Sequence, residues 1–379
     1  MLKIIIGFFI FCLILFIYLH TQFHLKNSND LEIYEIEQAS KDRIEEICDL
    51  RQPVLLDILH EDYGNKIINS TNKTFLAENY PVFDIKIRNA NDSSDSDIDV
   101  GLPLPLQVAC KLFKEDEKAC YFSENNGDFL QETGIIKHMS YNDSFLRPYL
   151  VSNCYYDIIL GSNNLETPFR YDLNYRNYYM VTQGSVTVKL SPPKSSKYLY
   201  PTNDYETFEF RSPINPWDPQ TKYKADFDKI KCLEIVLKPG KILYIPAYWW
   251  YTFKFQEDSS VSCFKYRTYM NNLAISPHIF MYALQNQNVE RKIVKKMDIT
   301  KLNNDNGGPN SDKLTNNDND NNYNNTNTAN NNNDDIAKTI NNANNISDSD
   351  EQIPSILIPK SEPEPMPPND LIGNAIVSQ

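Results

Sequence analysis

Arg170 and Asp172 are the residues whose types and spacing most directly suggest chemistry. They lie two positions apart in the segment Thr-Pro-Phe-Arg-Tyr-Asp (167–172), and residues two apart on a strand point to the same side. A carboxylate can ligate a metal or pair with a cation, whereas a protonated guanidinium has no lone pair for a metal. An unpaired carboxylate on a buried strand is costly. We therefore predict an internal ion pair between Arg170 and Asp172; the alternative is that Arg170 turns outward to solvent.

A second segment, residues 238–251, reads Lys-Pro-Gly-Lys-Ile-Leu-Tyr-Ile-Pro-Ala-Tyr-Trp-Trp-Tyr. Together the two segments resemble the cupin-like branch of the JmjC superfamily, which contains iron and 2-oxoglutarate oxygenases such as the asparaginyl hydroxylases. In that family the first segment runs Thr-Pro-x-His-x-Asp and the second ends in Pro-x-x-Trp-Trp-His. The resemblance covers about residues 31–272 and implies a double-stranded β-helix, the jelly roll of the cupins.

Taken residue by residue, the resemblance implies a pocket whose metal ligands are replaced. Thr167 matches a threonine that contacts the co-substrate, and Asn177 lies near a family asparagine, about one residue beyond the usual spacing. Asp172 matches the carboxylate ligand, while Arg170 and Tyr251 stand where the two ligand histidines would be. The candidate pocket residues are therefore Thr167, Arg170, Asp172, Asn177, Trp250 and Tyr251.

Two further features bear on the activity that the resemblance implies. The family has Gly-x-Lys, whose lysine holds the distal carboxylate of 2-oxoglutarate, whereas this chain has Gly-Ser-Val at 184–186. Trp250 invites a ligand-stacking interpretation, although the paired tryptophans of the family mostly pack the barrel. With iron lost, we expect Tyr251 to donate a hydrogen bond to Asp172. The sequence thus predicts no catalytic residue, no metal site and no cofactor.

Three functions remain open from the sequence. The one we predict is a pseudoenzyme, a non-catalytic binding or structural module with an unknown protein or small-molecule partner. The second is an iron and 2-oxoglutarate-dependent protein hydroxylase whose rearranged site is completed by His138 or a glutamate. The third is a cupin that binds a small molecule or glycan without metal. The net charge of −13 is spread along the chain, which argues against nucleic acid as a partner because phosphate binding needs a concentrated basic face.

The N-terminus predicts a membrane anchor. Residues 4–19 form an uninterrupted apolar run of about 16 residues, near the lower limit for crossing the hydrocarbon layer. Lys3 precedes the run, so the positive-inside tendency places the C-terminal domain in a lumen, outside the cell or on a viral surface. We expect residues 1–22 to be an uncleaved, single-pass signal anchor; the alternatives are a cleaved signal peptide and a buried soluble helix. Asn-x-Ser/Thr patterns that fit a lumenal placement begin at Asn69, Asn72, Asn91 and Asn142.

The elements that must position the candidate residues are short strands. Segments rich in aromatic and β-branched residues recur over residues 157–266, which favours a β-sandwich or barrel over a parallel α/β sheet. Helical apolar spacing covers residues 32–49, and residues 274–296 are expected to form one or two helices that close a domain spanning 31–297. Residues 298–379 are rich in Asn and Asp, then in Pro, and predict a disordered tail.

Overall fold

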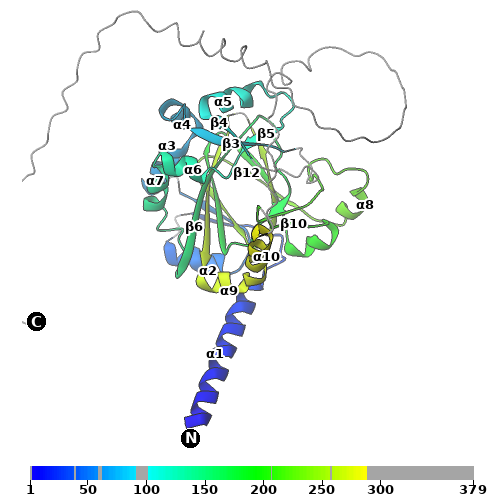
Figure 1. Cartoon of the computed structure of the whole chain (residues 1–379). Coiled ribbons are helices and arrows are strands. Elements are labelled where there is room, and N and C mark those ends of the chain that lie inside the picture. The colour runs from blue at the N-terminus through cyan, green and yellow to red at the C-terminus, as the bar shows by residue number, and fades with distance from the viewer. Residues whose placement is uncertain are drawn as a thin grey trace, which may run out of the picture. The chain divides into compact units, whose positions relative to one another are not determined.

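Two β-sheets face each other in the computed structural model, and helices cover the outer face of the larger sheet (Figure 1). The structure describes residues 2–37, 40–58, 62–90, 101–205, 207–256 and 258–287. The tail predicted for residues 298–379 lies outside these described residues.

In the described part of the chain, the larger sheet has nine strands in the order β1-β2-β13-β8-β15-β6-β5-β3-β4. In that order their bounds are Tyr34–Glu37, Val54–Asp57, Lys241–Pro246, Arg176–Gln183, Ser260–Thr268, Val151–Gly161, Tyr121–Ser123, Asp84–Asn89 and Leu102–Pro105. Strand β1 pairs with β2 in parallel, and the other neighbours are antiparallel.

The smaller sheet, counted over the same residues, has six antiparallel strands in the order β10-β11-β7-β14-β9-β12. Their bounds are Thr202–Asp204, Glu209–Arg211, Arg170–Tyr171, Trp250–Phe255, Val186–Ser191 and Leu233–Leu237. The prediction of a mainly β, double-stranded β-helix with flanking helices is therefore confirmed.

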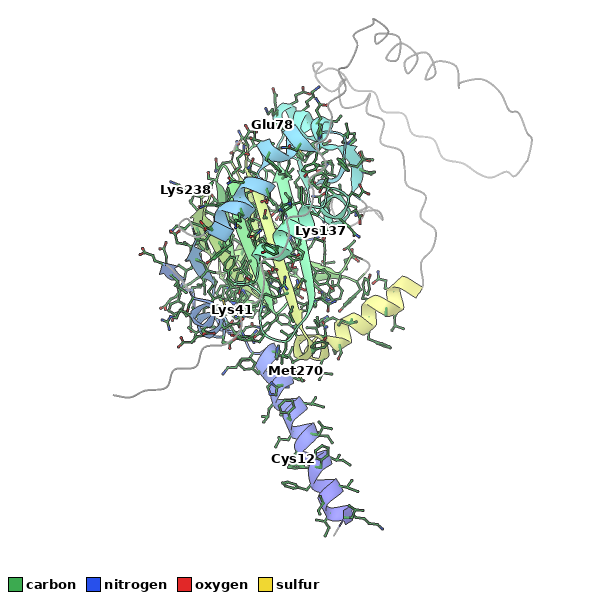
Figure 2. The ribbon with its side chains drawn as sticks, turned by 90° about the vertical axis from the view of Figure 1, so that its left-hand side faces the viewer. Cys12, Lys41, Glu78, Lys137, Lys238 and Met270 are labelled. Carbon is green, nitrogen blue, oxygen red and sulfur yellow. The ribbon has the colours of Figure 1, made fainter. Side chains whose placement is uncertain are left out.

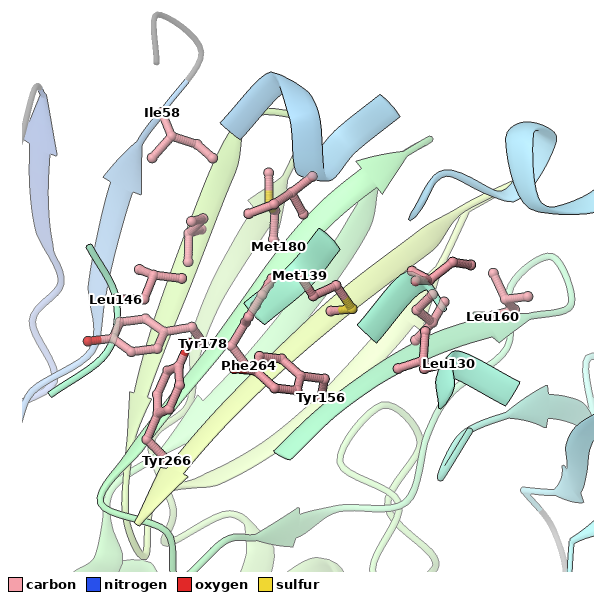
Figure 3. Packing of buried hydrophobic residues seen from close by; sticks show 14 of the residues in the cluster. Ile58, Leu130, Met139, Leu146, Tyr156, Leu160, Tyr178, Met180, Phe264 and Tyr266 are labelled. Atoms are coloured by element: carbon pink, nitrogen blue, oxygen red, sulfur yellow. The ribbon is translucent and has the colours of Figure 1, made fainter. Parts of the chain in front are cut away.

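Side chains alternate between two cores along the central strands, as the period of two in a strand requires. On β8, Tyr179 and Val181 pack between the two sheets, with Phe253 of the smaller sheet in the same cluster. Tyr178 and Met180 point the other way and pack with Met139 on the helical side, where Figure 3 shows them together. The strand β8, which carries the candidate residue Asn177, is thus packed on both faces.

The helices that flank the sheets are short. Their bounds are Lys41–Cys48 (α2), Asp62–Thr71 (α3), Lys73–Asn79 (α4), Leu106–Glu115 (α5), Gly127–Glu132 (α6), Ile135–Asn142 (α7), Lys224–Phe227 (α8), Tyr269–Ala274 (α9) and Ser276–Gln287 (α10), with a 3-10 helix at Pro193–Tyr198. Helices α9 and α10 confirm the expected closing helices as far as the described residues reach, although α9 begins five residues earlier than predicted, at Tyr269.

The helix predicted across residues 32–49 is wrong in its first half. That part forms β1, which extends the larger sheet beside β2. The helix begins only after Ser40, whose hydroxyl accepts a hydrogen bond from the backbone N–H of Arg43 at 3.3 Å. Pairing with another strand, which local periodicity does not report, overrides the helical apolar spacing before this N-cap.

Helix α1 spans Leu2–Leu25 and ends three residues beyond the anchor predicted for residues 1–22. It is the one helix of the described residues that is long and apolar enough to cross a membrane, and its apolar window is not buried in the structure. Its last turn contacts the domain: the ring of His24 lies 5.0 Å from that of Tyr175, and Arg51 stacks between Phe23 and Tyr175. The helix is therefore attached to the domain by packing as well as by the chain.

Candidate functional site

A cavity of about 710 Å³ opens beside the short strand β7. Its walls come from β6, β7, β11 and β15, from the loop after β5 and from α10. The carboxylate, lysine and arginine side chains that line it are Glu124, Asp157, Arg170, Asp172, Glu209, Lys265 and Arg267. A volume of this size is in the range of ligand sites, where a few placed polar groups give specificity.

Arg170 of β7 pairs with Glu124, a residue that the sequence did not single out. Its guanidinium donates from Nη1 to Oε1 at 2.9 Å and from Nη2 to Oε2 at 2.5 Å. Arg88 donates to the same carboxylate and, at 2.7 Å, to Glu209. Burial alone would raise the pKa of Glu124, but Arg170 and Arg88 outweigh it and lower that pKa to about 2. The carboxylate is therefore ionised and held by two guanidinium groups.

The predicted ion pair between Arg170 and Asp172 is wrong. Among the described residues, Arg170 makes its ion pair with Glu124, and Asp172 makes its own with Lys265. The prediction assumed that both side chains lie on one strand, but β7 ends at Tyr171, so the alternation does not extend to Asp172. The alternative, Arg170 turned outward to solvent, is also wrong, since this residue is 6% exposed.

Asp172 is held by a cation and two tyrosine hydroxyls. The Lys265 Nζ lies 3.0 Å from Oδ2, and the hydroxyls of Tyr251 and Tyr179 donate to Oδ2 at 2.9 and 2.8 Å. Burial would raise the pKa of Asp172, but Lys265, Arg170 and the hydrogen bonds outweigh it and lower that pKa. The backbone is fixed as well, because Tyr248, in the left-handed region with φ of 63°, donates its N–H to the Asp172 carbonyl at 2.9 Å.

Tyr251 contacts both charged groups that the sequence placed in the pocket. It is directly opposite Arg170 in the pairing of β14 with β7, and the Arg170 guanidinium lies 5.7 Å from the centre of its ring. Its hydroxyl donates to Asp172, as expected. Burial, followed by the charge of Asp172, raises the pKa of the phenol. Tyr251 therefore stays protonated and serves as a hydrogen-bond donor.

Of the six candidates, only Arg170 and Asp172 line the cavity, and Thr167, Asn177 and Trp250 make their contacts elsewhere. The Thr167 hydroxyl accepts from the backbone N–H of Phe253 at 2.9 Å, and the Asn177 amide donates to the carbonyl of Ile245 at 3.1 Å. Trp250 is buried with Phe169, and its indole N–H donates to Ser196 at 2.8 Å. Asn177 thus joins β8 to β13, Thr167 ties the segment before β7 to β14, and Trp250 ties β14 to the 3-10 helix. The structure thus brings Arg170, Asp172 and Tyr251 together and leaves Thr167, Asn177 and Trp250 outside the group.

Asp157 is a further cavity residue that sequence reasoning missed. Its carboxylate accepts from the backbone N–H groups of Asn125 and Asn126 at 2.8 and 2.7 Å. Burial raises its pKa to about 6, more than these N–H groups lower it. The acid therefore changes charge near pH 6.

Arg267 presents a positive charge on the cavity wall. Its guanidinium lies 5.1 Å from the ring centres of both Tyr155 and Phe208, and its Nε donates to Asn174 at 2.6 Å. Within the described part of the chain it has no ion pair with a carboxylate. Strand β15 thus carries Lys265 and Arg267 two positions apart. This alternation of charged residues in an otherwise apolar strand was the feature of the sequence that could have indicated them as cavity residues.

An iron and 2-oxoglutarate site does not fit these residues. Asp172 already carries the Lys265 ammonium, and Arg170 offers no lone pair. At the position of the co-substrate lysine, Val186 is fully buried between the sheets. Neither alternative ligand serves: His138 is exposed on α7, and Glu124 is held by two arginines. Over the described residues, no group of three or more His, Cys, Asp or Glu side chains is arranged to hold a metal.

Comparison with known proteins places the same region in a family context. Residues 114–273 match the family model of the cupin-like domain. HSPB1-associated protein 1 from Rattus norvegicus and from Homo sapiens are each 33% identical to this chain over 93 residues, which is 24% of this chain and 19% of theirs. JmjC domain-containing protein D from Dictyostelium discoideum is 32% identical over 95 residues, 25% of this chain and 21% of its own length. The chain spans about a fifth of the length of these curated relatives.

Proposed function

This chain belongs to the JmjC/cupin-like superfamily through the cupin-like domain at residues 114–273, and from this premise we propose that it is a membrane-anchored, non-catalytic binding module. The cavity beside β7 receives a ligand, and the chain performs no oxidation there. Helix α1 crosses the membrane once, and the domain lies on the lumenal or extracellular side. The apolar character of α1, its exposure and Lys3 in its first turn support this placement.

One observation carries the loss of catalysis: cationic side chains of the protein itself neutralise the two cavity carboxylates Asp172 and Glu124. Lys265 neutralises Asp172, and Arg170 with Arg88 neutralises Glu124. A divalent ion at Asp172 would have to displace the ammonium or lie within a few ångströms of it, where the repulsion between like charges is strong in a partly buried site. The carboxylates of the site are therefore stabilised by side chains and do not need a metal ion to neutralise them.

The cavity supports binding of a ligand that carries an anionic group. Arg267 is fixed between two aromatic rings and lacks a carboxylate partner among the described residues, so its charge is available to a ligand. Aromatic side chains on the same wall, Tyr155, Phe208 and Phe210, provide apolar contact. Because a relative is named HSPB1-associated protein 1, a protein segment with an acidic residue or C-terminus is one such ligand, and a small organic acid is the other.

Iron binding and turnover test this function. The full chain, purified in detergent, is loaded anaerobically with Fe²⁺ and 2-oxoglutarate, and bound iron and succinate are measured. We expect neither stoichiometric iron nor succinate above the protein-free control, and the same result for Asp172→Ala. Stoichiometric iron with 2-oxoglutarate turnover, both lost in Asp172→Ala, would overturn the proposal in favour of a hydroxylase with a rearranged site.

A further inference from the structure

Helix α10 is apolar on two opposite faces. Ile279 and Tyr282 line the cavity. Phe280, Met281 and Leu284 lie elsewhere around the helix and are 62%, 46% and 41% exposed. The helix, Ser276–Gln287, contains no Asp, Glu, Lys or Arg. The outward face of a helix on a soluble domain is normally polar, so this face is suited to contact with an apolar environment.

Exposed apolar side chains continue from α10 onto the neighbouring surface. Tyr269 and Leu273 of α9 are 67% and 42% exposed, and Leu150, immediately before β6, is 78% exposed. The N–H of Tyr269 donates to the carbonyl of Leu150 at 3.4 Å, which puts these two residues side by side. Tyr149 is exposed next to them. We call this surface the apolar collar and define it as Tyr149, Leu150, Tyr269, Leu273, Phe280, Met281 and Leu284.

The end of α1 lies at this collar. Helix α1 packs against α9, and the buried His24 ring contacts Thr268, the N-cap residue of α9, at 3.4 Å. Figure 2 shows Met270 of α9 where α1 meets the domain. A hydrocarbon layer of about 30 Å takes about 20 helical residues, so a span that begins near Leu2 ends near Thr21. The following residues, Phe23 and His24, then lie at the level of the lipid headgroups.

We propose that the apolar collar rests in the interfacial layer of the membrane that α1 crosses. This inference depends on the proposed anchoring and goes beyond it, because a tether alone does not fix the domain against the lipid. Tyrosine is enriched at the membrane–water interface, and the collar has two exposed tyrosines. The ammonium of Lys41 lies 4.9 Å from the ring centre of Tyr149, and a lysine at this depth can extend its charge toward the headgroups.

The position of α10 gives this contact a consequence for the cavity. Tyr282 lines the cavity and packs edge-on against Phe208, with ring centres 5.6 Å apart. The same helix presents Phe280 to the lipid. In the proposed orientation, the helix that forms part of the cavity wall is therefore also part of the membrane-facing side of the domain.

Photo-crosslinking in lipid vesicles tests this orientation. The photoreactive residue p-benzoylphenylalanine replaces Leu150, Leu273 or Leu284, one site at a time. Each full-length variant is reconstituted in phosphatidylcholine vesicles. The matched controls are Val82 and Val236, apolar residues outside the collar that are 76% and 58% exposed. Phe11, in the middle of α1, reports on the anchor itself. We expect lipid adducts at Phe11 and at the collar positions, and at least a tenfold lower yield at Val82 and Val236.

The outcomes separate the collar from the anchor. Lipid adducts at Phe11 with collar yields no higher than those of Val82 would overturn the collar proposal and leave the anchor standing. Absence of adducts at Phe11 would overturn the anchor and, with it, the collar. Adducts between a collar position and protein, whether a second copy, the chain's own C-terminal residues or another polypeptide, would show that protein covers this surface and would also overturn the proposal.

Discussion

The Lys265 ammonium lies 3.0 Å from Oδ2 of Asp172, the carboxylate at the position of the family's metal ligand. These two residues are 93 positions apart in the sequence and come together because β15 runs beside β8 near the end of β7. The positive charge that a metal would supply is thus provided by a side chain. Removing one partner of such a pair leaves a charge in a partly buried site, which is more costly than removing both.

Substituting Lys265 tests the strength of this pairing. We expect Lys265→Met to lower the free energy of unfolding by on the order of 3 kcal/mol, the lower end of the range for broken buried pairs, since a quarter of the Lys265 side chain is exposed, 25%. The control is Lys229→Met, which removes the exposed pair with Asp226 and should leave stability unchanged within error. Denaturant unfolding of the detergent-solubilised chain measures both; equal effects for the two variants would contradict the pairing.

Two cavity carboxyl groups with opposite pKa shifts contribute to the pH dependence of stability. Glu124 has a folded pKa of about 2, below the unfolded value of about 4.3, so its stabilising contribution is lost as pH falls through this window. Asp157 has a folded pKa of about 6, above the unfolded value of about 3.9, so its contribution is lost as pH rises from about 4 to 6.

The variant Asp157→Asn separates these contributions. We expect it to remove the fall in stability between about pH 4 and 6 and to keep the loss in more acidic solution. The control variant Asp128→Asn, at an exposed position on α6, should retain the fall. Unfolding free energies at pH 4, 5, 6 and 7 measure the difference. An unchanged slope in Asp157→Asn would show that another group titrates in this range.

Arg267→Ala tests recognition of an anionic group in the cavity. The probes are succinate, inorganic phosphate and a short peptide with an aspartate at its C-terminus, each followed by the melting temperature of the full chain. We expect at least one probe to stabilise the natural chain and the variant to bind that probe at least about tenfold more weakly, a loss of about 1.4 kcal/mol. Arg43→Ala, on the exposed face of α2, is the matched control. Equal binding by Arg267→Ala and the natural chain would remove Arg267 from the site.

Glycosylation reports on the proposed orientation. Asn69 is exposed on α3 within an acceptor pattern, whereas Asn142 is buried and donates its amide to the carbonyl of His138 at 2.8 Å. In a eukaryotic host with the domain in the secretory lumen, we expect Asn69→Gln to remove a glycosidase-sensitive mass and Asn142→Gln to leave the glycan mass unchanged. An Asn69 that carries no glycan in membranes containing the natural chain would indicate a cytosolic domain.

The strands of the domain could be read from the sequence because their signal is local. Within residues 157–266, where short strands were predicted, the structure has β8, β13 and β14, since aromatic and β-branched residues there pack on two buried faces. The hydrogen bond from Tyr251 to Asp172 also followed from residue types once the resemblance had placed the two together.

The ion pairs of the site could not be read in the same way. Glu124 lies in the loop after β5 and reaches Arg170 across 46 positions, and no local pattern distinguishes it from the other acidic residues of the chain. We predicted Asp172 as the partner of Arg170 because the two residues are close in the sequence. In the fold, Arg170 instead makes a bidentate ion pair with Glu124. The order of the strands in the sheets determines which charged side chains meet across a barrel, and the sequence pattern does not predict that order.

The most direct test of a metal-free site is a Mn²⁺ titration of the full chain in detergent, followed by electron paramagnetic resonance, with Mn²⁺ as the probe for a divalent ion at Asp172. If the positive charges of Lys265 and Arg170 replace that of the metal, the protein will not bind Mn²⁺ at Asp172. The signal of free Mn²⁺ will then increase from the first addition, and Asp172→Ala will give the same curve as the natural chain. Loss of one equivalent of free signal at micromolar Mn²⁺ in the natural chain, restored in Asp172→Ala, would contradict this and show that the barrel still binds metal.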